Sequence, residues 1–147
     1  MELYHYKDCG LPNVWLDGVE RIDTAYGPGV SIPAVEQLHT EIGKAIATAA
    51  KQMTGAEVKF LRTELDISQK TLAGLLDVAE NTVRRWEHDE VAIPGPAQRA
   101  LAGYYLETVN GGTFRDLMLK LAETDRIVTR MKLTFGLHNE AWEAEAA

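Results

Sequence analysis

The sequence predicts a mainly α protein: a helix-turn-helix bundle with a small β-containing N-terminal segment and a long C-terminal helix. From residue 33 onward, apolar residues recur every three or four positions, which is the helical period. Before residue 33, glycines and prolines interrupt the chain repeatedly and leave only short β-prone pieces. Residues 65–87 alternate apolar and polar positions as two short helices joined by a turn would.

The composition is that of a globular protein and excludes several classes. The chain has 147 residues, of which 46% are hydrophobic and 25% charged, so it is neither wholly disordered nor fibrous. It contains no apolar run of roughly 18 residues and no secretory signal pattern at its start. Cys9 is the single cysteine, which excludes an intramolecular disulfide. We therefore expect a cytoplasmic protein without a membrane partner.

Residues 1–52 form the first expected unit, a small sheet plus a helix. Short strands are expected over 13–16, 19–22 and 29–32, with Asp17-Gly18 as the hairpin turn between the first two. So small a sheet is not stable alone, so it must pack on the rest of the chain or on a partner. A helix is expected over 33–51, with Pro33 in its first turn.

Residues 53–108 form the second unit, a run of short helices. Thr54 and Glu57 have the spacing of a capping box, and Ser68 is placed to cap the next helix. A turn over 77–80 leads to a helix over 81–88, and Pro94 and Pro96 open a fourth helix that runs through residue 106.

Residues 109–147 form the third unit. Asn110-Gly111-Gly112 predicts a turn, and apolar residues near one face predict a helix over 114–135 that stops at Gly136. The tail from Asn139 is expected to be frayed or mobile. The apolar face of this helix either packs on its own chain or forms a dimer seam, and its length favours a homodimer.

The stretch 65–87 divides into a buried and an outward-facing set. We expect the apolar residues to hold two crossing helices together; they are Leu72, Ala73, Leu75, Leu76, Val78, Val83 and Trp86. The polar residues of the second helix then face outward; they are Glu80, Asn81, Thr82, Arg84 and Arg85. A recognition helix contacts base edges in the major groove through its N-terminal residues, and asparagine and arginine pair with adenine and guanine.

This stretch resembles the helix-turn-helix of the Xre/Cro-like regulators in Ser68-Gln69, Leu72-Ala73, Val78 and Arg85-Trp86-Glu87. A wider window, over residues 53–62, 66–73 and 81–87, resembles the MqsA/YgiT-type antitoxin and regulator family, with weaker likeness over 9–11, 26–32 and 38–39. The resemblance implies an N-terminal domain that binds a toxin or partner. It also implies a helix-turn-helix that represses its own operon as a dimer.

The candidate DNA-binding residues come from two sources. The resemblance implies that Asn81 and Arg85 read bases in double-stranded DNA and that Gln69 contacts the DNA backbone. Outward position alone adds Lys70, Thr82 and Arg84 as phosphate contacts.

The charge balance opposes this assignment in part. The chain carries a net charge of −7, and residues 53–108 contain six basic and nine acidic side chains. Specific binding then requires the basic residues to gather on one face, and its affinity should depend strongly on salt. Glu80 either repels phosphate or accepts a hydrogen bond from cytosine. The alternative is a helix-turn-helix used for protein contacts.

Metal, cofactor and enzyme functions are not expected. The zinc-binding members of the family carry two Cys-x-x-Cys pairs, whereas here Tyr6 stands at the partner position of Cys9 and no second pair exists. His5, Cys9 and His39 match no structural zinc spacing. The sequence has no phosphate-binding glycine loop and no nucleophile motif.

The remaining aromatic, acidic, cysteine and histidine residues of note are expected to have structural roles. Trp86 is expected in the core, and Glu87 is expected to anchor the domain by hydrogen bonds to nearby backbone. Cys9 is expected to be a small buried or edge residue, and His39 a surface or half-buried one. Trp15 is interpreted as the core of the N-terminal sheet, with a partner-binding anchor as the alternative.

The sequence thus predicts a sequence-specific, DNA-binding transcriptional regulator that represses its own promoter. The alternative is a type II antitoxin whose N-terminal segment neutralises a toxin protein, with or without DNA binding. Trp15, Tyr26 and Val30 are the candidate partner-binding residues for that role.

Overall fold

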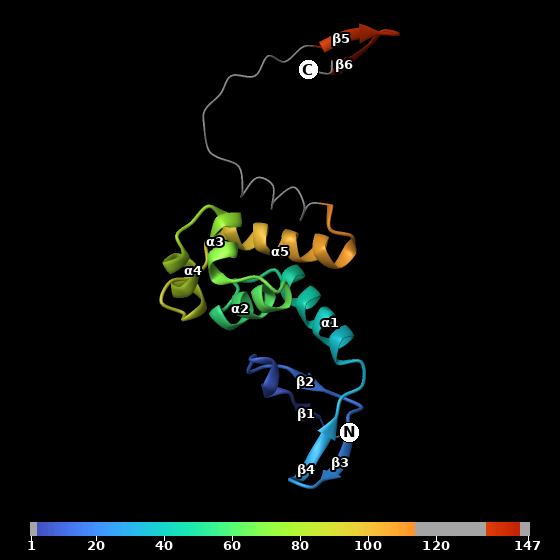
Figure 1. Ribbon diagram of the computed structural model, residues 1–147, viewed down its shortest axis with the longest axis vertical. Helices are drawn as coiled ribbons and strands as arrows, with labels where there is room; N and C mark the ends of the chain where they lie inside the picture. The colour runs from blue at the N-terminus through green and yellow to red at the C-terminus, as the bar shows by residue number, and fades with distance from the viewer. Residues whose placement is uncertain (1–2, 114–134, 145–147) are drawn as a thin grey trace.

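The computed structural model describes residues 3–113 and 135–144. This part of the chain contains five α-helices and three small antiparallel sheets of two strands each, so the fold is mixed with a large helical share (Figure 1). The helices are α1 (Val35–Thr48), α2 (Gly55–Glu64), α3 (Gln69–Leu76), α4 (Glu80–Glu87) and α5 (Gly95–Asn110). The strands are β1 (Tyr4–His5), β2 (Trp15–Leu16), β3 (Glu20–Thr24), β4 (Gly27–Ser31), β5 (Phe135–His138) and β6 (Ala141–Ala144), and a 3₁₀ turn covers Lys7–Cys9.

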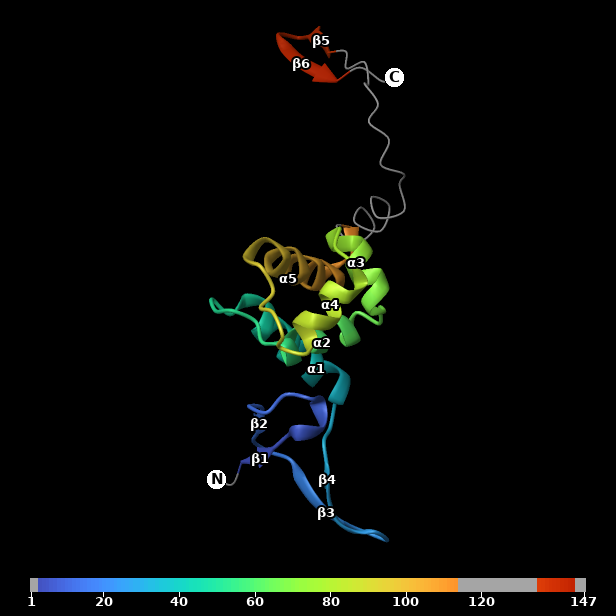
Figure 2. The ribbon, with the colours of Figure 1, turned by 90° about the vertical axis from the view of Figure 1, so that its left-hand side faces the viewer.

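The N-terminal strands pair differently from the prediction. Asp17-Gly18 does not close a hairpin: β2 pairs back with β1, whereas β3 pairs forward with β4. The β3–β4 hairpin aligns five residue pairs, more than the two residues of β2 can offer, and Thr24 Oγ1 donates to Gly27 O across its turn at 2.6 Å. This hairpin extends away from the helices (Figure 2). The segment 17–19 therefore connects two separate sheets.

Helix α1 is shorter than predicted at both ends. It begins at Val35, after Ala34 with a φ of 51°, so Pro33 precedes the helix and does not lie in its first turn. The left-handed Ala34 turns the chain by an angle that a continuous helix from Pro33 would not allow. The helix then packs along α5 and against α2.

A cluster around His39 ties the N-terminal segment to the helices. Tyr6, only 6% exposed, places its hydroxyl 2.8 Å from His39 Nε2, and His39 Nδ1 lies 3.3 Å from Glu64 Oε1 on α2. Burial raises the pKa of the Tyr6 phenol, and nearby acidic groups add to the effect. Leu11 is 3% exposed in the main apolar core. The segment that carries β1 and β2 is thus packed on the helices, as so small a sheet requires, whereas the β3–β4 hairpin is not part of this contact.

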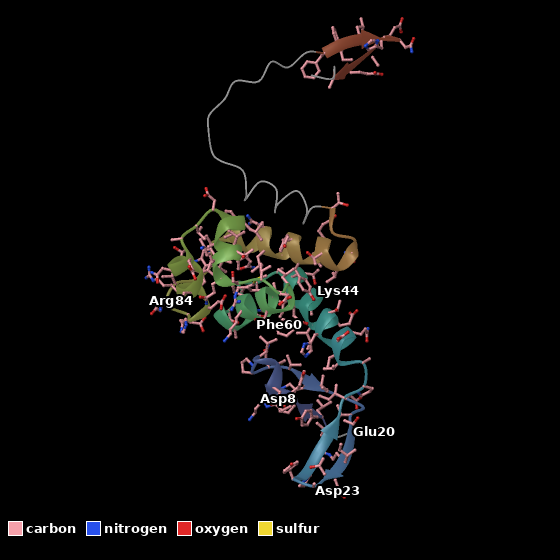
Figure 3. All side chains as sticks on the ribbon, viewed as in Figure 1. Asp8, Glu20, Asp23, Lys44, Phe60 and Arg84 are labelled. Carbon is pink, nitrogen blue, oxygen red and sulfur yellow. The ribbon has the colours of Figure 1, made fainter. Side chains whose placement is uncertain are left out.

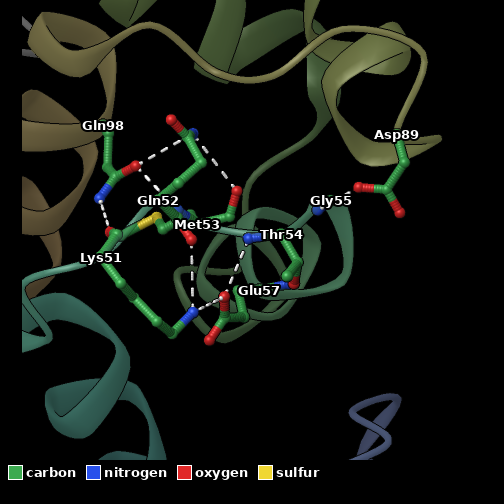
Figure 4. Close-up of polar contacts among 8 residues, drawn as sticks. All are labelled: Lys51, Gln52, Met53, Thr54, Gly55, Glu57, Asp89 and Gln98. Atoms are coloured by element: carbon green, nitrogen blue, oxygen red, sulfur yellow. Dashed lines mark hydrogen bonds and ion pairs between the residues drawn. The ribbon is translucent and has the colours of Figure 1, made fainter.

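The junction between α1 and α2 is held by polar side chains (Figure 4). Gln98 of α5 accepts from Met53 N at 2.9 Å and donates to Lys51 O at 2.7 Å. Thr54 and Glu57 form the predicted capping box, and the buried Glu57 carboxylate also pairs with Lys51 Nζ at 2.5 Å. These bonds fix the start of α2 against α5.

The apolar core lies among α1, α2, α3, α4 and α5, and Leu11 of the N-terminal segment adds to it. Val58, Leu61, Val83 and Leu101 have no exposed surface. Asp89 Oδ1 accepts from Gly55 N at 2.8 Å, and a side chain at Gly55 would lie 2.6 Å from Glu87 O, so only glycine allows α2 to approach α4 this closely. This packing positions α3 and α4.

The structure differs from the predicted C-terminal helix and tail over residues 135–144. Phe135 and Gly136 lie in β5, so Gly136 does not terminate a helix. The tail from Asn139 is not frayed at its start, because β6 pairs with β5 through a two-residue turn. Asn139 and Glu140 both have positive φ, as the favoured hairpin turn requires. Residues 114–134, and with them the predicted dimer seam, lie outside the described residues.

None of the helices in the described ranges is long and apolar enough to cross a membrane.

Candidate nucleic-acid interface

Helices α3 and α4 pack against each other and are joined by three residues, 77–79. Ser68 Oγ accepts from Thr71 N at 3.0 Å and caps α3 as predicted. Asp77, with a φ of 58°, ends α3, and Val78 N then donates to Ala73 O at 2.9 Å. Val78 packs on the core at the turn. The chain thus reverses tightly and starts α4 at Glu80.

The predicted division into buried and exposed positions is confirmed. The core-facing residues Leu72, Ala73, Leu75, Val83 and Trp86 are between 0% and 9% exposed, and Leu76 is half-buried against the core. Trp86, at 3%, is therefore a core residue, as expected.

The six candidate DNA-binding residues lie at the surface of these two helices. Lys70, Asn81, Arg84 and Arg85 are exposed, and Gln69 and Thr82 are half-buried. Arg84 points away from the bundle at the outer edge of α4 (Figure 3). The structure thus brings three basic side chains onto α3 and α4, with Glu80 beside them in the first turn of α4.

Asn81 and Arg84 are bonded to each other on the exposed side of α4. Asn81 Oδ1 accepts from Arg84 Nε at 3.0 Å and from Nη2 at 2.5 Å. The spacing i, i+3 places the two side chains next to each other on one helix face. This pair was not predicted from the sequence, although the spacing was the signal for it.

Arg85 forms a longer, exposed ion pair with Glu90. Its Nε lies 3.5 Å from Glu90 Oε2, and both side chains are about half exposed, at 48% and 51%. An exposed ion pair of this kind contributes little to stability, because water screens both charges. Arg85 therefore remains available to an outside ligand.

Glu87 anchors the domain, but not through the backbone as predicted. Its side chain is 3% exposed, and the carboxylate accepts from Arg62 Nε at 2.6 Å and Arg62 Nη2 at 3.0 Å. Gln69 Nε2 also donates to it at 3.2 Å, and Arg62 Nη1 donates to Ile67 O at 3.0 Å. A buried carboxylate is costly unless it is paired, and the Arg62 guanidinium supplies the opposite charge here. This network joins α2, α3 and α4 and fixes the position of Gln69.

The candidate partner-binding residues lie on the N-terminal sheets. Trp15 is 56% exposed and stacks on His5 with ring centroids 4.0 Å apart, so its interpretation as a core residue is wrong. The pair of two-residue strands places the His5 ring on the indole but is too short to cover it, so more than half of the Trp15 surface stays exposed. Tyr26 is fully exposed at the turn of the β3–β4 hairpin, and Val30 is half-buried on β4.

The three residues considered for zinc each have another contact. His5 Nε2 lies 2.6 Å from Pro12 O, Cys9 Sγ donates to Tyr6 O at 3.1 Å, and His39 contacts Tyr6 and Glu64. His39 and Cys9 are half-buried, as expected. Within residues 3–113 and 135–144, no three His, Cys, Asp or Glu side chains are grouped to hold a metal ion.

Comparisons of this chain with protein-family models, with curated proteins and with solved structures found no match.

Proposed function

We propose that this protein is a sequence-specific, DNA-binding transcriptional regulator without enzymatic activity, and that it represses its own promoter in the cytoplasm. Helices α3 and α4 are its helix-turn-helix, and α4 enters the major groove. The observation that carries the proposal is the outward face of these helices. Lys70, Asn81, Arg84 and Arg85 are exposed there while the opposite face is buried in the core.

The side chains then divide by role. Asn81 and Arg85 read bases, and Gln69, Lys70, Thr82 and Arg84 contact the DNA backbone. Gln69 Nε2 donates one N–H to Glu87 at the start of α3, so its second N–H is the one that donates to phosphate. We further propose that the protein acts as a homodimer, with recognition helices about 34 Å apart on one side of the DNA.

Arg85→Ala is expected to weaken binding of the full chain to its own promoter fragment by about tenfold or more, because one good base contact contributes roughly 1–3 kcal/mol. Gel shifts over a salt series measure the change. The wild-type affinity should fall steeply as salt rises, since phosphate contacts release counterions.

Arg99→Ala is the matched control for this experiment. Arg99 is an exposed arginine on α5, outside α3 and α4, so its loss changes the net charge by the same amount. We expect Arg99→Ala to bind within about twofold of the wild type, as a distant surface charge contributes little. Equal losses in the two variants, or none in Arg85→Ala, would contradict the assigned role of Arg85.

A type II antitoxin is the second candidate function, and the exposed N-terminal aromatic residues favour it. Trp15 and Tyr26 present apolar rings to solvent, and buried aromatic anchors often dominate protein interfaces. The cognate toxin would be the product of a small, co-transcribed neighbouring gene. This function and DNA binding are compatible, because they use different surfaces.

Co-expression with that neighbouring gene tests the antitoxin function. Wild-type protein should restore growth, the double variant Trp15→Ala/Tyr26→Ala should restore at least tenfold fewer colonies, and Arg85→Ala should restore growth fully. Expression levels of all variants are compared by immunoblot. A neighbour that is not toxic, or full rescue by the double variant, would exclude this role for the two aromatic residues.

A further inference from the structure

The base preference of α4 follows from the bond between Asn81 and Arg84, if the proposed DNA-binding function holds. Asparagine recognises adenine with two groups at once: its oxygen accepts from adenine N6, and its amide nitrogen donates to N7. In this structure, Asn81 Oδ1 already accepts from Arg84 Nε at 3.0 Å and from Nη2 at 2.5 Å. An amide oxygen has two lone pairs, so both are engaged.

The pair therefore presents hydrogen-bond donors and no free acceptor. Asn81 keeps the two N–H groups of Nδ2, and Arg84 keeps the N–H groups of Nη1 and the second one of Nη2. Guanine offers two acceptors, O6 and N7, at its major-groove edge, whereas adenine offers one acceptor beside a donor. The donor of adenine N6 would face another donor.

The other exposed charged side chains of α3 and the first turns of α4 are compatible with a G·C pair. Lys70 and Arg85 are exposed and can only donate. Glu80, exposed in the first turn of α4, can only accept when ionised, and cytosine presents its N4 donor in the groove beside the acceptors of guanine. A G·C pair satisfies both kinds of group, with guanine facing the arginine side chains and cytosine facing Glu80.

We propose that Asn81 and Arg84 act as one donor unit that reads guanine, so that each half-site carries a G·C pair opposite the start of α4. This inference rests on the proposed DNA-binding function and changes its detail. Arg84 becomes a base-reading residue, and Asn81 loses the adenine contact that its residue type alone suggests. Arg84 is then a specificity determinant because it controls what Asn81 can accept.

Selection of bound duplexes from a randomised pool, with the full wild-type chain, tests the proposal. We expect guanine to be enriched at one position of each half-site, with about tenfold weaker binding when adenine replaces it. In Arg84→Ala, Oδ1 of Asn81 is released and can accept from adenine N6. The preference at that position should move from guanine to adenine, measured as relative affinities of the two matched duplexes.

Lys70→Ala is the control for the loss of one positive charge. It removes a cation from the same surface but leaves the bond between Asn81 and Arg84 intact, so affinity should fall for both duplexes while their ratio stays that of the wild type. Circular dichroism establishes that both variants are folded.

The remaining outcomes separate the two levels of the proposal. Enrichment of adenine by the wild type, or an unchanged base preference in Arg84→Ala, overturns the donor unit and leaves DNA binding in place. A wild-type chain that enriches no sequence at any salt concentration overturns the DNA-binding function and the donor unit together.

Discussion

Arg62→Met is expected to lower the free energy of unfolding by about 3–5 kcal/mol, because it leaves the buried Glu87 carboxylate without its charged partner. The Glu87 side chain is 3% exposed and accepts two hydrogen bonds from Arg62, so among the described residues the substitution leaves it the Gln69 amide, at 3.2 Å. Urea unfolding of the full chain, followed by circular dichroism, measures the change in midpoint and slope.

The double variant Arg62→Met/Glu87→Met separates charge burial from packing. Two apolar side chains of similar length replace the ion pair, and such exchanges are often close to neutral. We expect the double variant to recover most of the stability that Arg62→Met loses. A double variant as unstable as the single one would show that the loss comes from the bond between Arg62 and Ile67 O, or from packing.

The helical part of the fold is well predicted from the sequence because its signals are local. Thr54 with Glu57, and Ser68 before α3, are caps formed within one turn of the chain, and the structure contains both. The apolar period likewise places Val83 and Trp86 in the core. These features depend on residues three or four positions apart and need no knowledge of distant partners.

The β structure is poorly predicted for the opposite reason. Trp15–Leu16 is too short to specify a partner, and its strand is completed by Tyr4–His5, which the sequence does not mark as a strand. The C-terminal hairpin turns at Asn139-Glu140, where a glutamate adopts positive φ, which is uncommon for this residue type. Pairing in such short strands is decided by the surrounding packing and not by local propensity.

The candidate site is predicted less completely than the helices and more completely than the strands. The helical period predicts which side chains of α3 and α4 face outward, and the structure agrees. The helical period does not predict the hydrogen-bond partners of these side chains. Arg62 reaches Glu87 across 25 positions of sequence, and the bond between Asn81 and Arg84 depends on the rotamers that the two side chains adopt. The donors and acceptors that this surface presents depend on these bonds, so residue type alone is an incomplete guide to what it can bind.

Gly43→Ala is expected to destabilise the fold by about 2–3 kcal/mol, because a methyl group at this position would overlap the ring and hydroxyl of Tyr105. Tyr105 is 2% exposed on α5, its hydroxyl donates to Thr40 O at 3.3 Å, and burial raises its pKa. Because the ring is buried, it has little room to turn aside, so we expect α1 to move away from α5. The midpoint of urea unfolding measures the loss.

Gly103→Ala is the matched control, since it places the same methyl group in another helix interior. Among the described residues, and apart from the backbone of its own helix, a side chain at Gly103 would meet no atom within 4 Å, so the substitution should stabilise α5 by up to about 1 kcal/mol through helix propensity alone. The two substitutions are thus expected to change the stability of the protein in opposite directions. If Gly43→Ala also stabilised the protein, α1 would not rest on α5 at Tyr105.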